Sequence, residues 1–494
     1  MPYERLSAQD SMFLHIEKPQ QPQHVGSLGI MDGEPFRGDD GRFRLDDVRE
    51  VIGERLHLVP RFRRRVMPVP FEQGRPVWVD DEHFDLAYHV RLTALPTPGD
   101  EEQLLALFER IQSIPLDRRR PLWELWFVEG LEGGRVADIQ KTHHCLVDGI
   151  SGVDVATVLF DLSPETTRLE PPPWLPEPPP SGPQLMVESI VERLVEPAEL
   201  ARSVRAALRV PRQVVAGALD VRDAVSSNAA QAPRTPWNVP IGPHRRWRPA
   251  RVPLSVAKSI KDAATTDDRI PGRVSLNDVV LGAVASGLRT FLEKRDEPVD
   301  DLELRAMVPV TMRASAEREA ASAEGTAALG NRVSMMNAQL PMSPADPVER
   351  LAGIVAGMQA LKDSGAAVGA DLLMQMSSYA PPTVFAVASR LLIRSRAVNL
   401  TITNVPGPQF PLYCLGSKVH EAFPYVGIVD GMALTVAVLS YDGQLGFGIT
   451  GDRDVLPDID VLADGIVAGF GELEVAYGLG KAARKRAKKK KEQA

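Results

Sequence analysis

Residues His143-His144-Cys145-Leu146-Val147-Asp148-Gly149 form the stretch that says most about this chain. If residues 139–142 are a strand, the two histidines lie at its end and point to opposite faces, so that only one can enter a given cavity. Asp148 follows in the turn before an apolar helix that begins near Gly149, where it is placed to fix the local geometry. Adjacent histidines followed at this spacing by Asp-Gly arise by chance in about one in a thousand chains of this length.

The chemistry of histidine gives this pattern a catalytic interpretation. An imidazole takes and returns protons near neutral pH, which suits acyl transfer from a thioester to a hydroxyl group. Such a reaction also needs a hydrogen-bond donor for the oxygen of the tetrahedral intermediate. The alternative is that both histidines are satisfied in a core and that Asp148 caps the next helix. A zinc site is disfavoured, because His143, His144 and Cys145 are consecutive and cannot easily converge on one ion. We therefore expect no metal.

Further landmarks lie in order along nearly the whole chain. They are Leu6-Ser7-Ala8-Gln9-Asp10, Phe84-Asp85-Leu86-Ala87-Tyr88-His89-Val90-Arg91, Pro121-Leu122-Trp123, Asn238, Ile241-Gly242-Pro243-His244-Arg245-Arg246, Leu276-Asn277-Asp278-Val279, Gly330-Asn331-Arg332 and Asn404-Val405-Pro406-Gly407-Pro408. With the His-His-x-x-x-Asp-Gly motif, they make the chain resemble the bacterial wax ester synthase/diacylglycerol acyltransferase family of the coenzyme A-dependent acyltransferase superfamily. The motif alone is also similar to that of acetyltransferases and peptide-condensing domains, so the narrower resemblance depends on the added landmarks.

The resemblance implies roles for the residues of the histidine motif. His144 is expected to be the general base, and His143 to be mostly structural. Asp148 is expected to orient the active-site loop through an ion pair with a distant arginine, for which Arg313 is one candidate. Gly149 is grouped with the substrate-binding residues.

Other site residues also follow from the resemblance. Asn277 is expected to donate its side-chain amide to the oxyanion, and Asp278 to hold the helix start that presents it. Pro121, Leu122 and Trp123 are expected to shape a lipid tunnel, although ordinary core packing explains them as well. Residues 404–408 are expected to form a turn near the domain interface, and a plain proline turn is the alternative.

The implied activity is transfer of a long-chain fatty acyl group from acyl-CoA to diacylglycerol, and also to long-chain alcohols as wax esters. Transfer in one step needs no acyl-enzyme and no tightly bound cofactor. A nucleophilic Cys145 is the competing mechanism, but on a strand its side chain points away from that of His144. Two other functions stay open: a transferase of the same superfamily with another acceptor, and a non-catalytic protein of lipid surfaces.

Length and composition favour two domains. A chain of 494 residues with 44% hydrophobic side chains is too long for a single core. It contains no run of eighteen apolar residues and begins without a basic segment followed by an apolar one. We therefore expect a cytoplasmic protein, peripheral at the inner membrane or lipid droplets. Cys145 and Cys414 are expected to be free thiols, because neither has a partner at metal or redox spacing.

The chain is expected to form two mixed α/β domains with the active site in a channel between them. Prolines at residues 170–180 predict a linker, and residues 185–225 have the apolar spacing of bridging helices or of helices on a lipid surface. The expected boundaries are 1–170, 171–240 for the linker and connecting helices, 241–480, and a tail at 481–494. Helices are expected at 46–56, 101–114, 256–264, 276–293 and 347–362, and strands at 125–128, 136–139, 304–309, 400–403, 433–440 and 445–450. A hairpin turn is expected at 441–444.

The basic residues of the C-terminal end are concentrated in one tail. The whole chain has a net charge of −8. The tail at residues 481–494 contains eight Lys and Arg residues, all between Lys481 and Lys491, and one Glu. This tail can attract the anionic headgroups of a membrane or lipid droplet, or it can be a solvated disordered end. Nucleic acid is an unexpected partner, because the body of the protein is acidic. The sequence sets no oligomeric state.

Overall fold

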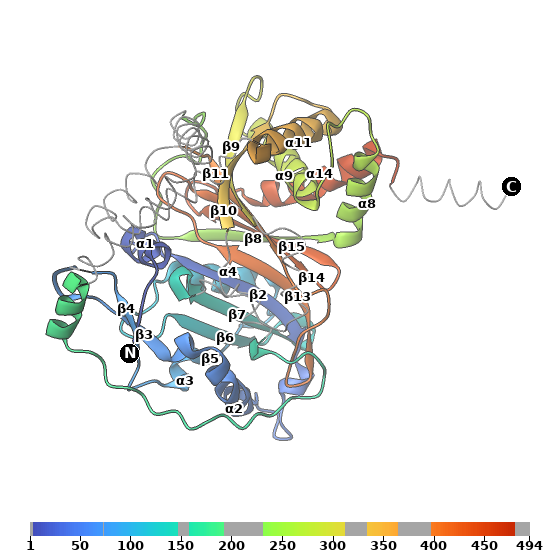
Figure 1. Cartoon of the computed structure of the whole chain (residues 1–494). Coiled ribbons are helices and arrows are strands. Elements are labelled where there is room, and N and C mark those ends of the chain that lie inside the picture. The colour runs from blue at the N-terminus through green and yellow to red at the C-terminus, as the bar shows by residue number, and fades with distance from the viewer. Residues whose placement is uncertain are drawn as a thin grey trace.

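The computed structural model describes residues 3–72, 74–146, 158–191, 231–311, 333–363 and 397–479 (Figure 1). Its α-helices include α1 (Ala8–Ile16), α2 (Leu45–Arg55), α3 (Leu86–His89), α4 (Glu101–Ser113), α8 (Leu254–Thr265), α9 (Leu276–Glu293), α11 (Pro347–Asp363) and α14 (Asp460–Ala476). Short 3-10 helices include η3 (Pro60–Arg63), η4 (Pro70–Glu72) and η6 (His144–Leu146). The fold is mixed α/β and has two parts, as the sequence predicted.

The strands of the described residues form two sheets of six and one of three. The first large sheet has the order β12-β13-β2-β7-β6-β5, the second has the order β10-β9-β11-β14-β15-β8, and the small sheet has the order β1-β4-β3. Their bounds are β1 (Glu4–Arg5), β2 (His24–Asp32), β3 (Arg64–Met67), β4 (Val77–Asp80), β5 (Val90–Ala94), β6 (Trp123–Glu129), β7 (Arg135–His143), β8 (Arg245–Pro253), β9 (Glu303–Thr311), β10 (Val333–Pro341), β11 (Leu400–Pro406), β12 (Tyr413–Cys414), β13 (Ser417–Val426), β14 (Leu434–Tyr441) and β15 (Gln444–Asp452).

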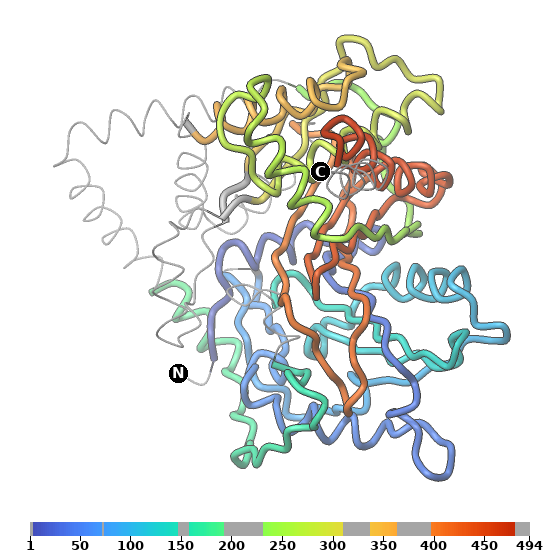
Figure 2. Tube along the Cα trace, turned by 90° about the vertical axis from the view of Figure 1, so that its right-hand side faces the viewer, coloured from blue at the N-terminus to red at the C-terminus, as the bar shows by residue number. Residues whose placement is uncertain are grey.

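Two strands of the C-terminal half, β13 and its short neighbour β12, extend the sheet of the N-terminal half. β13 pairs antiparallel with β2 from Val419 opposite Met31 to Val426 opposite Val25. Figure 2 shows this orange segment descending from the upper part of the molecule into the lower part. The sequence did not predict this crossover, because the boundary expected at residue 240 treats everything after it as a separate domain. Apart from this crossover, the expected domain boundaries stay predictions.

Local sequence signals explain the elements that were predicted. α9 begins with a capping box, in which the Ser275 side chain accepts from Asp278 N–H and the Asp278 side chain accepts from Ser275 N–H. The predicted helix at 276–293 is confirmed over its full length. The predicted turn between β14 and β15 is also confirmed, since Asp442 (φ 41°) and Gly443 (φ 79°) both have the positive φ of a two-residue hairpin loop.

The two halves share a hydrophobic core. Trp247 of β8 packs on Phe108 of α4 with their ring centroids 4.3 Å apart, and Phe423 and Tyr425 of β13 belong to the same cluster. Gly448 of β15 lies so close to β13 that a Cβ there would overlap the carbonyl oxygen of Pro424. Side chains from both halves therefore bury one another, and the sheets cross in close contact.

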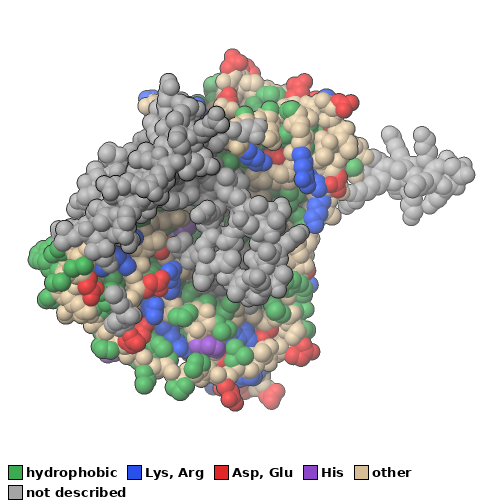
Figure 3. Space-filling model, viewed as in Figure 1, with side chains coloured by type: hydrophobic (Ala, Val, Ile, Leu, Met, Phe, Trp, Pro, Cys, Tyr) green, Lys and Arg blue, Asp and Glu red, His purple; other side chains and the backbone are tan. Residues whose placement is uncertain are grey.

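The proline-rich residues 171–181 contain no helix or strand, and a helix at residues 182–191 follows them. This helix packs on the small sheet through Leu185, which clusters with Val77 and Val79 of β4. Its outer face is apolar, with Val187, Ile190 and Val191 all more than half exposed. Figure 3 shows green side chains gathered over this helix at the left edge of the molecule. The predicted continuation of the helices to residue 225 lies outside the described residues.

No helix in the described ranges is both long enough and apolar enough to cross a bilayer.

Candidate active site

The backbone fixes both histidines at the end of β7. His143 is the last residue of this strand and lies opposite His24 of β2. Its N–H donates to the carbonyl of Leu122 at 2.9 Å, while the N–H of His144 donates to the carbonyl of Gln23 at 2.8 Å. The strand predicted before the motif is therefore confirmed, and His144 begins the 3-10 turn η6 rather than continuing the strand. His144 stacks on Phe13 of α1, whereas His143 faces Glu17, the residue that follows this helix.

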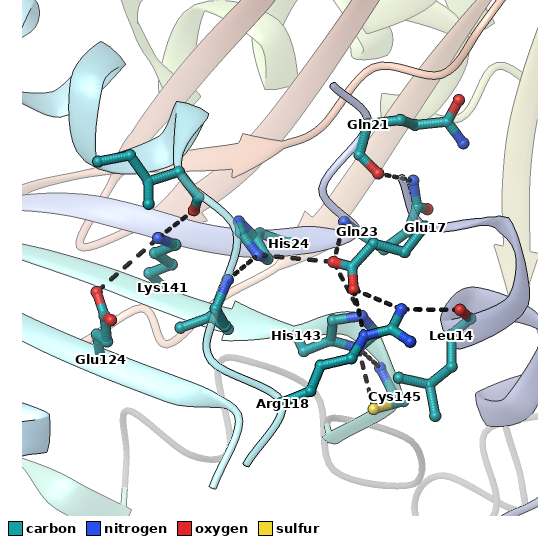
Figure 4. A network of polar contacts seen from close by, with 12 residues as sticks. Leu14, Glu17, Gln21, Gln23, His24, Arg118, Glu124, Lys141, His143 and Cys145 are labelled. Atoms are coloured by element: carbon teal, nitrogen blue, oxygen red, sulfur yellow. Dashed lines mark hydrogen bonds and ion pairs between the residues drawn. The ribbon is translucent and has the colours of Figure 1, made fainter. Parts of the chain in front are cut away.

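His143 is fully buried within a polar network (Figure 4). Its Nδ1 accepts from the backbone N–H of Cys145 at 3.2 Å and lies 3.0 Å from Cys145 Sγ. Its Nε2 faces Glu17 Oε1 at 3.4 Å. The ring of His143 thus closes the turn η6 on one side and meets a carboxylate on the other.

Glu17 joins several parts of this network. Its Oε2 accepts from Arg118 Nη2 at 2.6 Å, and its Oε1 accepts from Gln23 N–H at 3.1 Å. Burial raises the pKa of Glu17, but the hydrogen bond and charge of His143, then Arg118 and Gln23, outweigh it and hold the pKa at about 2. Glu17 is therefore a carboxylate throughout the neutral range.

Two more buried titratable groups line the strands behind His143. Burial, followed by the nearby charge of Lys141, lowers the pKa of His24 well below its usual value, so this ring is neutral. Lys141 donates to the carbonyls of Ile111 at 2.9 Å and Ile114 at 2.5 Å, at the end of α4. Burial lowers the pKa of Lys141 to about 8.

His144 is the more accessible of the two motif histidines. It is partly exposed, and its ring stacks on Phe13 of α1 with centroids 3.8 Å apart and planes 17° apart. Burial, followed by the charge of His143, lowers the pKa of His144 to about 4. His144 is therefore neutral near pH 7, and within the described residues the hydrogen bond to its ring comes from its own backbone rather than from another residue.

Cys145 is fully buried, and burial raises the pKa of its thiol well above the usual value. Cys414 is likewise a buried free thiol. A nucleophilic cysteine needs an accessible thiolate. The geometry thus favours direct transfer over an acyl-cysteine at position 145.

The second group of candidate residues lies at the start of α9. Asn277 Oδ1 accepts from Asn404 Nδ2 at 3.3 Å, so the amide NH2 of Asn277 remains to donate elsewhere. Asp278 is buried and holds the helix start, because its Oδ2 accepts from Ser275 N–H at 2.8 Å and from Ser275 Oγ at 2.7 Å. Asn404 lies in β11, which continues to Pro406, so the turn predicted at residues 404–408 is wrong for its first three residues. Within the described residues, no hydrogen bond joins Asn277 to His144.

Pro121, Leu122 and Trp123 lead into β6 in the core of the N-terminal half. Trp123 is 2% exposed, donates to the carbonyl of Phe62 at 2.8 Å and stacks on His89 at 4.6 Å. It lines a cavity of about 20 Å³, which is the size of one water molecule. These contacts are those of core packing, and the proposed role of Pro121, Leu122 and Trp123 in a lipid tunnel stays a prediction.

Several expected site residues lie outside the described residues: Asp148, Gly149, Arg313 and the tail from Lys481. No group of three or more His, Cys, Asp or Glu side chains that could hold a metal occurs among the described residues. The predictions of no metal and of the Asp148 ion pair therefore stay predictions.

Sequence reasoning missed three residues of this site: Phe13, Glu17 and Arg118. The landmark at residues 6–10 marks the start of α1, since Ser7 caps that helix. The stacking of Phe13 and the carboxylate of Glu17 come only from how α1 packs on η6. A lone Glu or Arg in a chain with 25% charged residues gives no signal of its own.

The chain is similar to known proteins over nearly its whole length. Residues 6–280 match the wax ester synthase/diacylglycerol acyltransferase catalytic domain, and residues 329–474 match the corresponding C-terminal domain. A Mycobacterium tuberculosis protein named as a candidate diacylglycerol O-acyltransferase is 33% identical, over 95% of this chain and 90% of that protein.

Solved structures show the same arrangement. The wax ester synthase/diacylglycerol acyltransferase from Marinobacter aquaeolei VT8 has a TM-score of 0.66 and 29% identity, and covers 96% of this chain and 100% of its own. The starter condensation domain of rhizomide synthetase, solved with C8-CoA, has a TM-score of 0.54 at 13% identity, covering 96% of this chain and 94% of its own. The second likeness concerns the fold alone.

Proposed function

The chain belongs to the wax ester synthase/diacylglycerol acyltransferase family, and on this premise we propose that it transfers a long-chain acyl group from acyl-CoA to diacylglycerol. It is an acyltransferase, and long-chain alcohols are the second acceptor class, giving wax esters. Acyl-CoA enters as a substrate, and the reaction needs no resident cofactor. An alternative acceptor within the same superfamily changes the product but not the chemistry.

The observation that carries this proposal is the state of His144. A neutral, partly exposed imidazole whose ring is hydrogen-bonded to no other described residue is suited to act as a base. In the proposed step, His144 takes the proton of the acceptor hydroxyl as that oxygen attacks the thioester carbonyl. The amide NH2 of Asn277 stabilises the oxyanion. Collapse breaks the carbon–sulfur bond, and the protonated His144 returns its proton to the CoA thiolate.

We further propose that the protein works at a lipid surface inside the cell, as a peripheral protein. Diacylglycerol resides in membranes and lipid droplets, and the described residues offer an apolar face on the helix at residues 182–191. Phe71, 81% exposed, lies in the neighbouring loop, where Pro70 approaches Gly182. Apolar side chains that project together from a surface helix suit insertion below lipid headgroups. The tail from Lys481 to Lys491 is a further candidate for this attachment, from sequence alone.

The test uses purified full-length protein with palmitoyl-CoA and either dioleoylglycerol or hexadecanol, and follows released CoA and ester product together. We expect His144→Ala to lower kcat by roughly a hundredfold to ten-thousandfold, the usual contribution of general acid–base catalysis. His420→Ala is the matched control, because His420 is an exposed histidine of β13 that pairs with Asp32. CoA release without ester from either acceptor points to another acceptor class. Equal turnover by the two variants removes His144 from the mechanism.

A further inference from the structure

The contacts of His143 determine which of its nitrogens is protonated. Nδ1 faces the backbone N–H of Cys145, so it must be the acceptor. The ring proton then lies on Nε2, which faces Glu17 Oε1 at 3.4 Å. In the opposite tautomer, the Nδ1–H donor faces the N–H donor of Cys145, and the unprotonated Nε2 faces the carboxylate of Glu17. Both contacts are unfavourable. Glu17 therefore stabilises the only tautomer that closes the turn η6.

The same turn carries His144, and both rings meet residues of α1 or of its C-terminal cap. Phe13 stacks on His144, while Glu17 follows the last residue of α1 and meets His143. Arg118 holds this end of the helix, since its Nη2 donates to the carbonyl of Leu14 at 2.8 Å as well as to Glu17. The ring of His144, its stacking partner and the turn below it thus depend on one helix whose end is fixed by one carboxylate.

From this geometry we infer that Glu17 is a positioning residue for acyl transfer, which holds the Nε2–H tautomer of His143 and through it the orientation of His144. The inference rests on the proposed function of His144. Glu17 touches no reacting atom and acts only through His143. It differs from the expected role of Asp148, which concerns the loop after the motif.

The groups that face this pair come from every neighbouring element. They are His24 from β2, Arg118 from the segment before β6, Lys141 on β7 behind His24, and Asp10 from α1 near Cys145. Arg118 contacts Oε2 of Glu17, the oxygen that does not face His143. A change from carboxylate to amide at Glu17 keeps the volume but lets an NH2 face either His143 or Arg118. With the NH2 toward His143, the amide opposes the Nε2–H of the assigned tautomer, and with the NH2 toward Arg118 the contact with that guanidinium is lost; neither orientation changes the packing volume.

The experiment compares Glu17→Gln with wild type in the palmitoyl-CoA and dioleoylglycerol assay. We expect kcat to fall by about ten- to a hundredfold, by analogy with removal of the partner that orients a metal-bound histidine, with KM for palmitoyl-CoA unchanged. The matched control is Asp430→Asn, the same acid-to-amide change in an ion pair with the neighbouring Lys18 at 3.2 Å. It should keep wild-type kcat.

A double variant separates positioning from general destabilisation. If Glu17 acts through His143, Glu17→Gln should cost no further kcat in a His143→Gln background. Additive losses, or a Glu17→Gln enzyme with wild-type kcat, overturn the inference, whereas an inactive wild type overturns the proposed function instead. Should Glu17→Gln fail to fold, nitrogen NMR of wild-type protein labelled in histidine decides the matter, because a protonated Nδ1 on His143 excludes the assigned tautomer.

Discussion

Replacing Asn277 with aspartate removes one hydrogen-bond donor from the candidate site and little else. The side chain keeps its size, and an oxygen still accepts from Asn404 Nδ2, which lies 3.3 Å from Asn277 Oδ1. The capping box of Ser275 and Asp278 is untouched. Only the NH2 that we assign to the oxyanion is lost, and it is replaced by an oxygen that repels developing negative charge.

The expected magnitude follows from the loss of one oxyanion donor, about 3 to 4 kcal/mol or a hundredfold to a thousandfold in kcat. Asn404→Asp should give a comparable loss by another route. An aspartate at 404 accepts rather than donates, so the Asn277 amide must turn its NH2 toward it and present its oxygen to the substrate. Steady-state kcat with palmitoyl-CoA and dioleoylglycerol, alongside thermal unfolding, measures both effects.

The matched control is Asn238→Asp, an amide that is structural. Asn238 Nδ2 donates to the carbonyls of Asn399 at 3.1 Å and Gly431 at 2.9 Å. Its replacement should lower the melting temperature while the folded fraction keeps its kcat. The assignment of Asn277 is refuted if Asn277→Asp and Asn404→Asp both have kcat values near wild type. It is also refuted if the loss of kcat in each variant merely follows the drop in its melting temperature.

Two further predictions concern acid stability and lipid surfaces. Burial lowers the pKa of His89 to about 4. Below about pH 6.5 this histidine is therefore protonated in the unfolded chain but not in the folded chain. The free energy of unfolding falls as the pH drops from about 6.5 to about 4. Between pH 7 and pH 5, the free energy of unfolding measured with urea should fall by about 2 kcal/mol less in His89→Phe than in wild type. An equal fall in the two proteins contradicts a buried neutral ring at His89. At the lipid surface, Val187→Asp with Ile190→Asp should reduce co-sedimentation with dioleoylglycerol-containing vesicles while leaving turnover of detergent-dispersed substrate intact. Substitution of the exposed Val475 on α14 is the control, and undiminished vesicle binding by the double variant rules out this helix as the docking face.

Sequence reasoning found elements whose signals are local. α9 was predicted over its full length because its cap, its apolar pattern and its first turn all lie within one segment. The hairpin at Asp442 and Gly443 was found for the same reason. β2 and β13 were missed, because β13 is recognised as part of the first sheet only through its pairing with a strand far away in the chain.

The same limit applies to the site. His144, Asn277 and Asp278 belong to motifs with a fixed spacing, so a resemblance could point to them. Glu17 and Arg118 act through contacts between α1, β7 and the segment before β6, and no short-range pattern encodes such contacts. The state of His144 also depends on burial and on the charge of His143, which only the folded arrangement supplies.

The crossover strand has a consequence for how the protein is made. Ser417 of β13 donates to the carbonyl of Asp32 in β2 across 385 residues of chain. At a translation rate of roughly 5 to 20 residues per second, β2 leaves the ribosome about 20 to 80 seconds before its edge partner exists. During that interval the edge of β2 is an open template for other chains. Nascent-chain folding should therefore need a holding chaperone or a temporary partner, and release of the N-terminal half as a separate product should lead to aggregation.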